Sequence, residues 1–195
     1  CLANGDPSPA LLHAAGGPRV TYRAAQAASP ARTMIATRAR TLLARLEREG
    51  VVRRPDGTSG SLRVRKSFTF GADRRVPTLD VTVDVTNTGN QPFEALLGIE
   101  WALNMLGGGG NPSAWYAVGG DRARFDAARV APATHHVSMG NDYIGIELES
   151  RPQPAAGAWW SSIETISVSE SGFEGIHQGG CLLWVWPLRL EPGAT

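Results

Sequence analysis

The stretch Leu62-Arg-Val-Arg-Lys-Ser-Phe-Thr-Phe70 alternates apolar and polar residues over most of its length. Successive side chains of a β-strand point to opposite faces of a sheet, so this period of two predicts a strand with one buried face. Residues 79–85 repeat the pattern as Leu-Asp-Val-Thr-Val-Asp-Val. Lys66 interrupts the apolar positions and needs an acidic or carbonyl partner if it is buried. The two stretches predict neighbouring, half-buried strands.

Short candidate strands follow along the rest of the chain, separated by Gly, Asp, Asn and Pro residues. Many short strands with polar turns are typical of an antiparallel β-sandwich or barrel. No strand–helix–strand alternation is present, which argues against a doubly wound sheet or a complete TIM barrel. The four consecutive glycines at 107–110 predict a loop. Further strands are expected at 93–104, 115–118, 123–125, 136–139, 143–149, 158–160, 163–168 and 182–190.

The first quarter of the chain is harder to interpret. We expect loops and edge strands over residues 1–40, with a short strand at 20–23. Residues 41–52 fit two structures, because their Ala, Leu and Arg content favours a helix while their alternation favours a strand. A length of 195 residues suits one large domain. We therefore expect a single β-sandwich domain over residues 1–195, and the missing initiator Met suggests a fragment of something longer.

The net charge of +1 conceals an asymmetry between the two parts of the chain. Residues 1–75 carry 14 basic and 5 acidic side chains, whereas residues 76–195 carry 5 basic and 13 acidic ones. A basic groove that binds nucleic acid is normally interleaved with stacking aromatic residues, and residues 23–67 contain no aromatic residue. No apolar run is long enough to span a membrane. We expect neither nucleic acid nor membrane as a partner.

Cysteine and histidine give little indication of a metal or a disulfide. Cys1 and Cys181 are the only cysteines, and no Cys/His spacing resembles a zinc site. A free, buried thiol is the expected state of Cys181. Sparse cysteine fits a reducing compartment, so we expect a cytoplasmic protein. No cofactor and no metal ligand are predicted, although the many carboxylates leave a Ca²⁺ site open.

The densest polar cluster lies at residues 164–179. Paired carboxylates at the right separation can cleave a glycosidic bond by acid/base chemistry. The same groups could instead satisfy backbone amides at a sheet corner, or hold sugar hydroxyls without catalysis. The polar side chains of this cluster are Glu164, Glu170, Glu174, His177 and Gln178.

A second candidate is Glu100 beside Trp101, within an otherwise apolar strand. A buried carboxylate needs a partner, so Glu100 should form an ion pair with Lys66 or an arginine. Alternatively, Glu100 could grip a sugar while Trp101 stacks on it. The neighbours Trp159 and Trp160 should face opposite ways, one buried and one near the surface.

The run Trp160-Ser-Ser-Ile-Glu-Thr-Ile-Ser-Val-Ser-Glu-Ser-Gly-Phe-Glu-Gly-Ile-His-Gln-Gly179 resembles the C-terminal β-sandwich domain of family 57 glycoside hydrolases, the α-amylase/4-α-glucanotransferase group. His177 replaces the aromatic residue of the family pattern. Looser matches are Lys66, the stretch 98–104 and the final 186–190. The resemblance covers most of residues 41–191. It implies a galactose-mutarotase-like supersandwich, and it favours a strand at 41–52.

The resemblance also implies a function. In that family the catalytic residues lie in a separate N-terminal barrel, so no catalytic residue is expected here. The resemblance implies an accessory domain that supports the catalytic barrel of the same parent chain, with α-glucan as a further candidate partner. Basic strands should lie near acidic ones, so that Lys66 or an arginine neutralises Glu100 or Glu170. The residues expected to contact carbohydrate or to form a polar network are Glu100, Trp101, Trp160, Glu164, Glu170, Glu174, His177 and Gln178.

Two alternatives remain open. A mutarotase-like sandwich can host an autonomous sugar epimerase, with His177 as the acid and Glu174 or Glu100 as the base. The chain could also be a purely structural domain whose basic half docks a partner domain.

Overall fold

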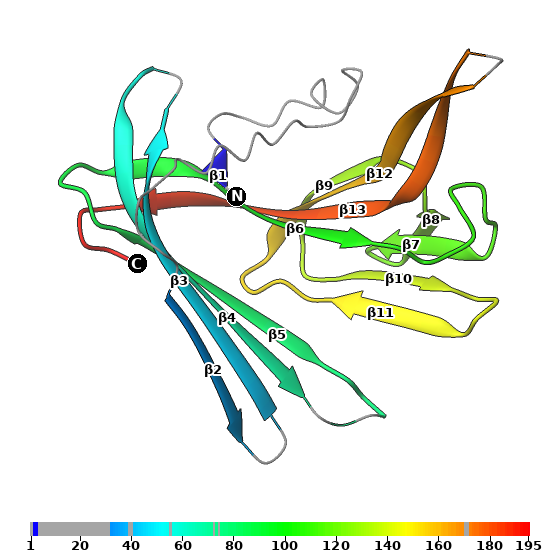
Figure 1. Cartoon of the computed structure of the whole chain (residues 1–195), viewed down its shortest axis with the longest axis horizontal. Helices are drawn as coiled ribbons and strands as arrows, with labels where there is room; N and C mark the ends of the chain where they lie inside the picture. The colour runs from blue at the N-terminus through cyan, green and yellow to red at the C-terminus, as the bar shows by residue number, and fades with distance from the viewer. Residues whose placement is uncertain are drawn as a thin grey trace. The chain divides into compact units, whose positions relative to one another are not determined.

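A computed structural model describes residues 2–3, 32–38, 41–54, 56–71, 73, 75–169 and 172–195 (Figure 1). Every regular element of these residues is a β-strand, which confirms the all-β class. The chain divides into two compact units. Most of the first, here called the sandwich unit, is Leu96–Pro187. The second, the sheet unit, comprises the described part of Thr21–Ala95 together with Leu188–Thr195. The expectation of one domain over residues 1–195 stays a prediction.

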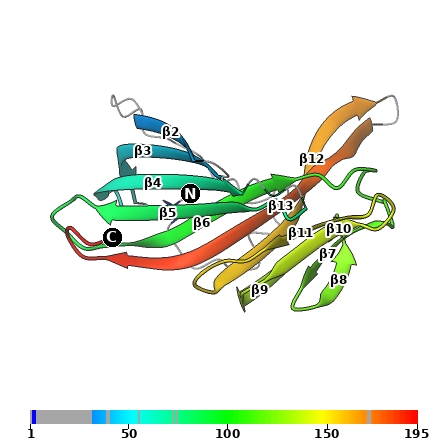
Figure 2. The same ribbon diagram turned by 90° about the horizontal axis from the view of Figure 1, so that it is seen from below.

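The sheet unit contains a four-stranded antiparallel sheet of order β2-β3-β4-β5. Figures 1 and 2 show these strands lying side by side. The prediction of strands at 41–52, 62–70 and 79–85 is confirmed. The predicted strand at 20–23 lies outside the described residues. The strands are β2 (Arg32–Arg38), β3 (Thr41–Arg53), β4 (Ser59–Gly71) and β5 (Leu79–Asn87).

The alternation read from the sequence determines the two faces of this sheet. Val64 and Phe68 lie opposite Val85 and Val81 on an apolar face, and Leu62 on that face is fully buried. The strand β5 ends at Asn87, whose buried side chain donates to the carbonyls of Gln91 and Leu190 and accepts from the Gly89 amide. Because a buried amide needs such partners, this network holds the turn that follows β5.

Two sheets build the sandwich. The first has the order β1-β6-β13-β12-β9 and the second β11-β10-β7-β8. The first contains β1 (Leu2–Ala3), β6 (Phe93–Leu103), β9 (Arg129–Thr134), β12 (Ala156–Ser169) and β13 (Gly172–Leu190). The second contains β7 (Ala114–Val118), β8 (Asp121–Arg124), β10 (Val137–Asn141) and β11 (Ile146–Ser150).

The core of the sandwich unit lies between these two sheets. Trp160 of β12 stacks on Tyr116 of β7 with ring centroids 4.6 Å apart, and its indole N–H donates to the Phe125 carbonyl at 2.9 Å. Met139 and Leu182 are buried in the same cluster. Apolar burial of this kind is the main favourable term in folding. The antiparallel sandwich predicted from the sequence is confirmed, whereas its galactose-mutarotase-like classification stays a prediction.

The strands differ from the prediction in three respects. The strand expected at 143–149 is β11, which begins only at Ile146 because a turn precedes it. The expected strands at 158–160 and 163–168 are parts of the single strand β12, and 182–190 is the second half of the 19-residue β13. The strand β9 was missed because its sequence Arg-Val-Ala-Pro-Ala-Thr contains a proline, which usually marks an edge strand. The predicted loop at the four glycines is confirmed. Within the part of the chain that is described, no helix is long and apolar enough to cross a membrane.

Candidate functional site

A β-bulge in the hairpin of β12 and β13 organises the candidate site. Ile163 lies opposite Gly179 and Glu164 lies opposite His177, so Gln178 is an extra residue on β13. A single extra residue shifts the alternation of a strand by one position. Beyond the bulge, His177 therefore lies on the same face as Glu164. Trp160, four residues before Glu164 in β12, lies on this same face and points into the core.

The hairpin continues past the sandwich as an arm, defined as residues 164–169 of β12 and 172–177 of β13. The pairing of β12 with β9 ends at Trp160, so the arm consists of two strands only. Figures 1 and 2 show the far end of this hairpin projecting beyond the other strands of the sandwich unit. Its base is the candidate functional site.

His177 anchors the base of the arm. Its Nδ1 lies 2.7 Å from the Oγ of Ser162, and its half-buried ring meets the edge of Phe125 at 6.1 Å between centroids. The loop after β6 packs closely against this ring. A Cβ atom added to Gly109 would lie 3.0 Å from the imidazole Cγ. The close approach explains why this position of the glycine run suits a residue without a side chain.

Gln178 and Asn104 connect the bulge to the same loop. The amide of Gln178 donates to Thr165 Oγ1 at 3.1 Å, and its backbone carbonyl accepts from Asn104 Nδ2 at 2.8 Å. The Oδ1 of Asn104 accepts from the backbone N–H of Leu106, where the loop begins. We call Asn104, Ser162, Glu164, His177 and Gln178 the arm-base cluster. Three of these residues were singled out from the sequence as site candidates, whereas Ser162 and Asn104 only stood within the quoted motifs.

The polar side chains of the arm do not all share a face. Glu174 lies opposite Ser167 with regular pairing from there to His177, so Glu174 and His177 point to opposite faces. The pair of His177 and Glu174 considered for an epimerase is therefore not assembled. Glu174 is likewise on the opposite face from Glu164, so these two carboxylates do not flank a common site. Glu170 lies outside the described residues.

The structure corrects the expectation of a buried Glu100. Glu100 is exposed, because Ile99, Trp101 and Leu103 of β6 are the residues that pack against the core. Glu100 and Trp101 thus face opposite ways and cannot hold one sugar together. Burial, and secondarily the Glu100 carboxylate, raise the pKa of the Cys181 thiol to about 11. Glu100 is therefore a neighbour of Cys181 on the outer face of the five-stranded sheet.

The tryptophans agree with the expected alternation. Trp160 is 1% exposed whereas Trp159 is half-buried. Because both faces of the Trp160 indole lie within the core, this residue is unavailable to a ligand in this structure and belongs to the core, not to a contact surface. Trp186 packs against the same core and donates to the Pro154 carbonyl.

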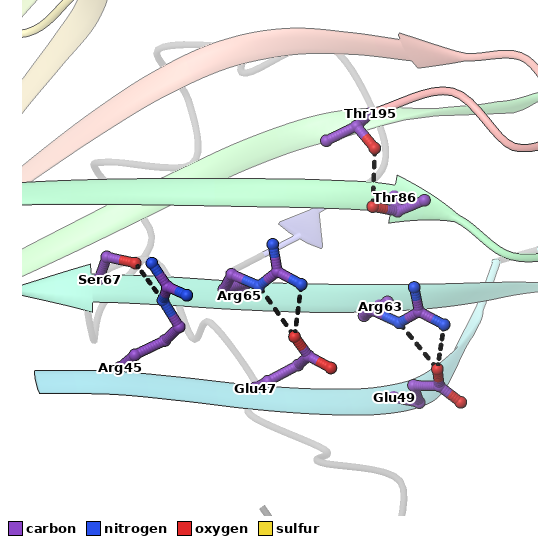
Figure 3. A network of polar contacts seen from close by, with 8 residues as sticks. All are labelled: Arg45, Glu47, Glu49, Arg63, Arg65, Ser67, Thr86 and Thr195. Carbon is purple, nitrogen blue, oxygen red and sulfur yellow. Dashed lines mark hydrogen bonds and ion pairs between the residues drawn. The ribbon is translucent and has the colours of Figure 1, made fainter. Parts of the chain in front are cut away.

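The expected pairing of Lys66 or an arginine with Glu100 or Glu170 stays a prediction. Lys66 is exposed. Arg63 pairs with Glu49 at 2.7 Å and Arg65 with Glu47 at 2.8 Å across the β3–β4 hairpin (Figure 3). The register places each arginine directly opposite its glutamate, so these two arginines are neutralised within the basic half of the chain. Among the described residues, no group of three or more His, Cys, Asp or Glu side chains could hold a metal ion.

Comparison with known proteins shows which family and which solved structure this chain is similar to. Residues 24–194 match the model of the family described as "Alpha-amylase/4-alpha-glucanotransferase, C-terminal". Alpha-amylase 1 of Dictyoglomus thermophilum is 28% identical over 130 residues, which are 67% of this chain and 18% of that protein. The crystal structure of 4-alpha-glucanotransferase from Thermococcus litoralis has the same fold over 81% of this chain and 21% of its own, with a TM-score of 0.55 and 21% identity.

The chain thus spans about a fifth of the length of each of these two proteins. The family match covers both units and most of the strands described above. This chain belongs to the family of C-terminal domains of α-amylases and 4-α-glucanotransferases.

Proposed function

We propose that this chain is the non-catalytic C-terminal accessory domain of an α-glucan-processing enzyme of the family 57 type. In this proposal it supports the catalytic barrel of the same polypeptide and contacts the glucan. The observation that carries the proposal is the family match over residues 24–194. The fractional coverage of the two relatives agrees with it, because each has room for a further, larger domain.

The placement of the carboxylates supports a non-catalytic role. Glycoside hydrolysis requires two carboxyl groups that flank one bond, about 5–10 Å apart. Glu164 and Glu174 of the arm lie on opposite faces of the hairpin, and Glu100 lies on the face of Cys181. Among these described candidates, Glu164 therefore has neither of the other two carboxylates on its own face of the hairpin. The chemistry is therefore assigned to a domain outside this chain.

We assign the glucan contact to the arm-base cluster. Sugar hydroxyls are bound by carboxylates and imidazoles, and Glu164 and His177 of this cluster lie opposite each other on one face of the hairpin. The side-chain amide of Gln178 donates to Thr165 on the other face. Glu164 and Gln178 are exposed, whereas His177 is half-buried and held by Ser162. The imidazole, held by Ser162, loses little side-chain entropy when a ligand binds. Trp101, Trp160, Glu100 and Glu174 are left out of this proposed surface because they face elsewhere or lie in the core.

The complete polypeptide that contains this chain provides the test. It should cleave or transfer glucosyl units of an α-glucan, and the 195-residue chain alone should do neither. Reducing-end release and oligosaccharide redistribution from maltooligosaccharides measure the two activities. Activity of the 195-residue chain alone would contradict the accessory role, as would a complete polypeptide inert toward α-glucans.

Two finer points stay predictions. The cytoplasmic location rests on cysteine usage alone. A purely structural docking role without glucan contact is the remaining alternative, and a titration with maltooligosaccharides separates it from the proposal.

A further inference from the structure

The face of the arm that continues from the core carries three strongly exposed apolar side chains. Ile166 is 74% exposed, Val168 is 78% exposed and Phe173 is 85% exposed. Val168 lies directly opposite Phe173 in the hairpin, and Ile166 is two residues from Val168, so the three share one face. We call this set the arm strip. Exposed apolar clusters of this kind usually mark interaction sites.

The opposite face of the arm is mostly polar. Its residues are Thr165, Ser167 and Glu174, together with the amide of Gln178 that binds Thr165, although Ile176 is also on this side. A strand pair with one apolar and one polar face is the pattern of a sheet that is buried on one side. An isolated two-stranded hairpin is marginally stable in water. Both observations indicate that the arm strip is covered in the complete protein.

We propose that the arm strip docks against the catalytic domain of its own polypeptide, with its apolar side chains in an apolar groove of that domain. This inference rests on the proposed function, because it takes the remainder of the enzyme as the partner. It goes beyond that function by naming the surface of this chain that makes the contact.

The size of the strip favours a tethered partner over a second copy of the chain. The three exposed side chains present about 300–400 Å² in total. For scale, one aromatic residue buries roughly 150–250 Å². Two copies meeting through their strips would bury about 600–800 Å², which is below the roughly 1,200 Å² of a stable interface between separate molecules. A domain in the same polypeptide is present at a high effective concentration, so a small apolar contact is sufficient.

The length of the relatives points to the same occupant. This chain corresponds to 18% of the similar amylase and 21% of the similar glucanotransferase. Roughly four fifths of each of these proteins therefore lies outside the part that this chain matches. Docking there would also place Glu164 and His177, at the foot of the strip, beside the partner domain.

Photocrosslinking in the complete polypeptide tests this proposal. Benzoylphenylalanine replaces Phe173 in one variant and Val168 in a second, so that a folding defect in either leaves the other informative. Two controls carry the same group at Glu174, on the opposite face of the arm, and at Tyr143, which is 87% exposed in another part of the sandwich unit. Mass spectrometry of the digested protein identifies the peptide that each group has captured.

The expected result is an intramolecular crosslink from positions 173 and 168 to a peptide outside residues 1–195, with much lower yields from positions 174 and 143. Crosslinks that double the molecular mass would assign the strip to a second copy and overturn the proposal. Crosslinks only within residues 1–195, or equal yields from all four positions, would also overturn it. The glucan assay of the same protein is read independently, so an active enzyme without the crosslink contradicts this inference alone.

Discussion

The Nδ1 of His177 lies 2.7 Å from the Oγ of Ser162, which joins the two strands of the hairpin where the arm leaves the sandwich. The pair is partly buried, so leaving either group without its hydrogen-bond partner would cost free energy of folding. The contact depends on the bulge at Gln178, because without it His177 would point to the opposite face. Ser162 thereby positions the imidazole of the proposed glucan contact.

Ser162→Ala should destabilise the chain by about 1 kcal/mol, since this is the usual net value of one hydrogen bond. The same substitution should cost much less when His177 is already replaced by Ala. Urea unfolding of the four proteins of this double-mutant cycle measures the coupling energy, which we expect at about 0.5–1.5 kcal/mol. Additive effects would show that the two side chains do not interact.

Gly109→Ala should destabilise the chain, because the added Cβ would lie 3.0–3.1 Å from three atoms of His177. Overpacking of this kind typically costs about 1–3 kcal/mol. The neighbour Gly110 is the matched control, since a Cβ added there meets nothing within 4 Å. Thermal and urea unfolding of Gly109→Ala and Gly110→Ala should differ clearly, and equal stabilities would argue against the described loop position.

Trp160→Ala should be among the most damaging substitutions in the chain. It removes a buried indole stacked on Tyr116 and leaves a cavity, for which about 3–5 kcal/mol is typical. Trp159→Ala, at the next residue on the opposite face, should cost distinctly less because that side chain is only half-buried. Denaturant unfolding measures both values, and a reversed order would contradict the assignment of the two faces.

Cys181 should react slowly with alkylating reagents at neutral pH. Its pKa is raised to about 11, first by burial and then by the Glu100 carboxylate, and only the thiolate is nucleophilic. In a Cys1→Ser background, iodoacetamide alkylation should rise with pH toward a midpoint near 11. Glu100→Gln should lower the pKa and speed the reaction at pH 8, whereas an unchanged rate would place Glu100 away from Cys181.

The same pKa shift makes a prediction about stability. A free thiol titrates at about 9.0, and in the folded chain it titrates at a higher pH. Between these values the folded state binds more protons than the unfolded state, so the contribution of Cys181 to stability falls as the pH rises above about 9. Cys181→Ala should flatten the decline in urea midpoint over this alkaline range, and a curve of unchanged slope would contradict the shift.

The local pattern of the sequence predicts the strands, whereas the site depends on how they pair. The alternation over Leu62–Phe70 is strong enough to give β4 directly. The bulge at Gln178 leaves no such pattern, because it arises from the pairing of β12 with β13. The prediction for Glu100 was wrong for a related reason. The neighbours of Glu100 are the apolar Ile99 and Trp101, and the small Gly98 and Ala102 share its face. The stretch therefore reads as uniformly apolar, although only Ile99, Trp101 and Leu103 pack against the core.

Pairing also explains what was missed among the charges. Glu49 and Arg63 are fourteen residues apart and form an ion pair only because the β3–β4 register places them opposite each other. The sequence revealed the excess of arginines but not that two of them are neutralised within the same half of the chain. Exposed pairs of this kind contribute little to stability, so their effect is mainly on the surface charge.

A maltooligosaccharide titration of the ¹⁵N-labelled 195-residue chain tests the central claim most directly. We expect millimolar ligand to shift the amide signals of Glu164, His177 and Gln178 without being cleaved. Glu164→Ala should abolish these shifts, whereas Glu147→Ala, an exposed glutamate of β11, should leave them unchanged. The absence of shifts at millimolar ligand, or shifts confined to other strands, would contradict a glucan contact at the base of the arm.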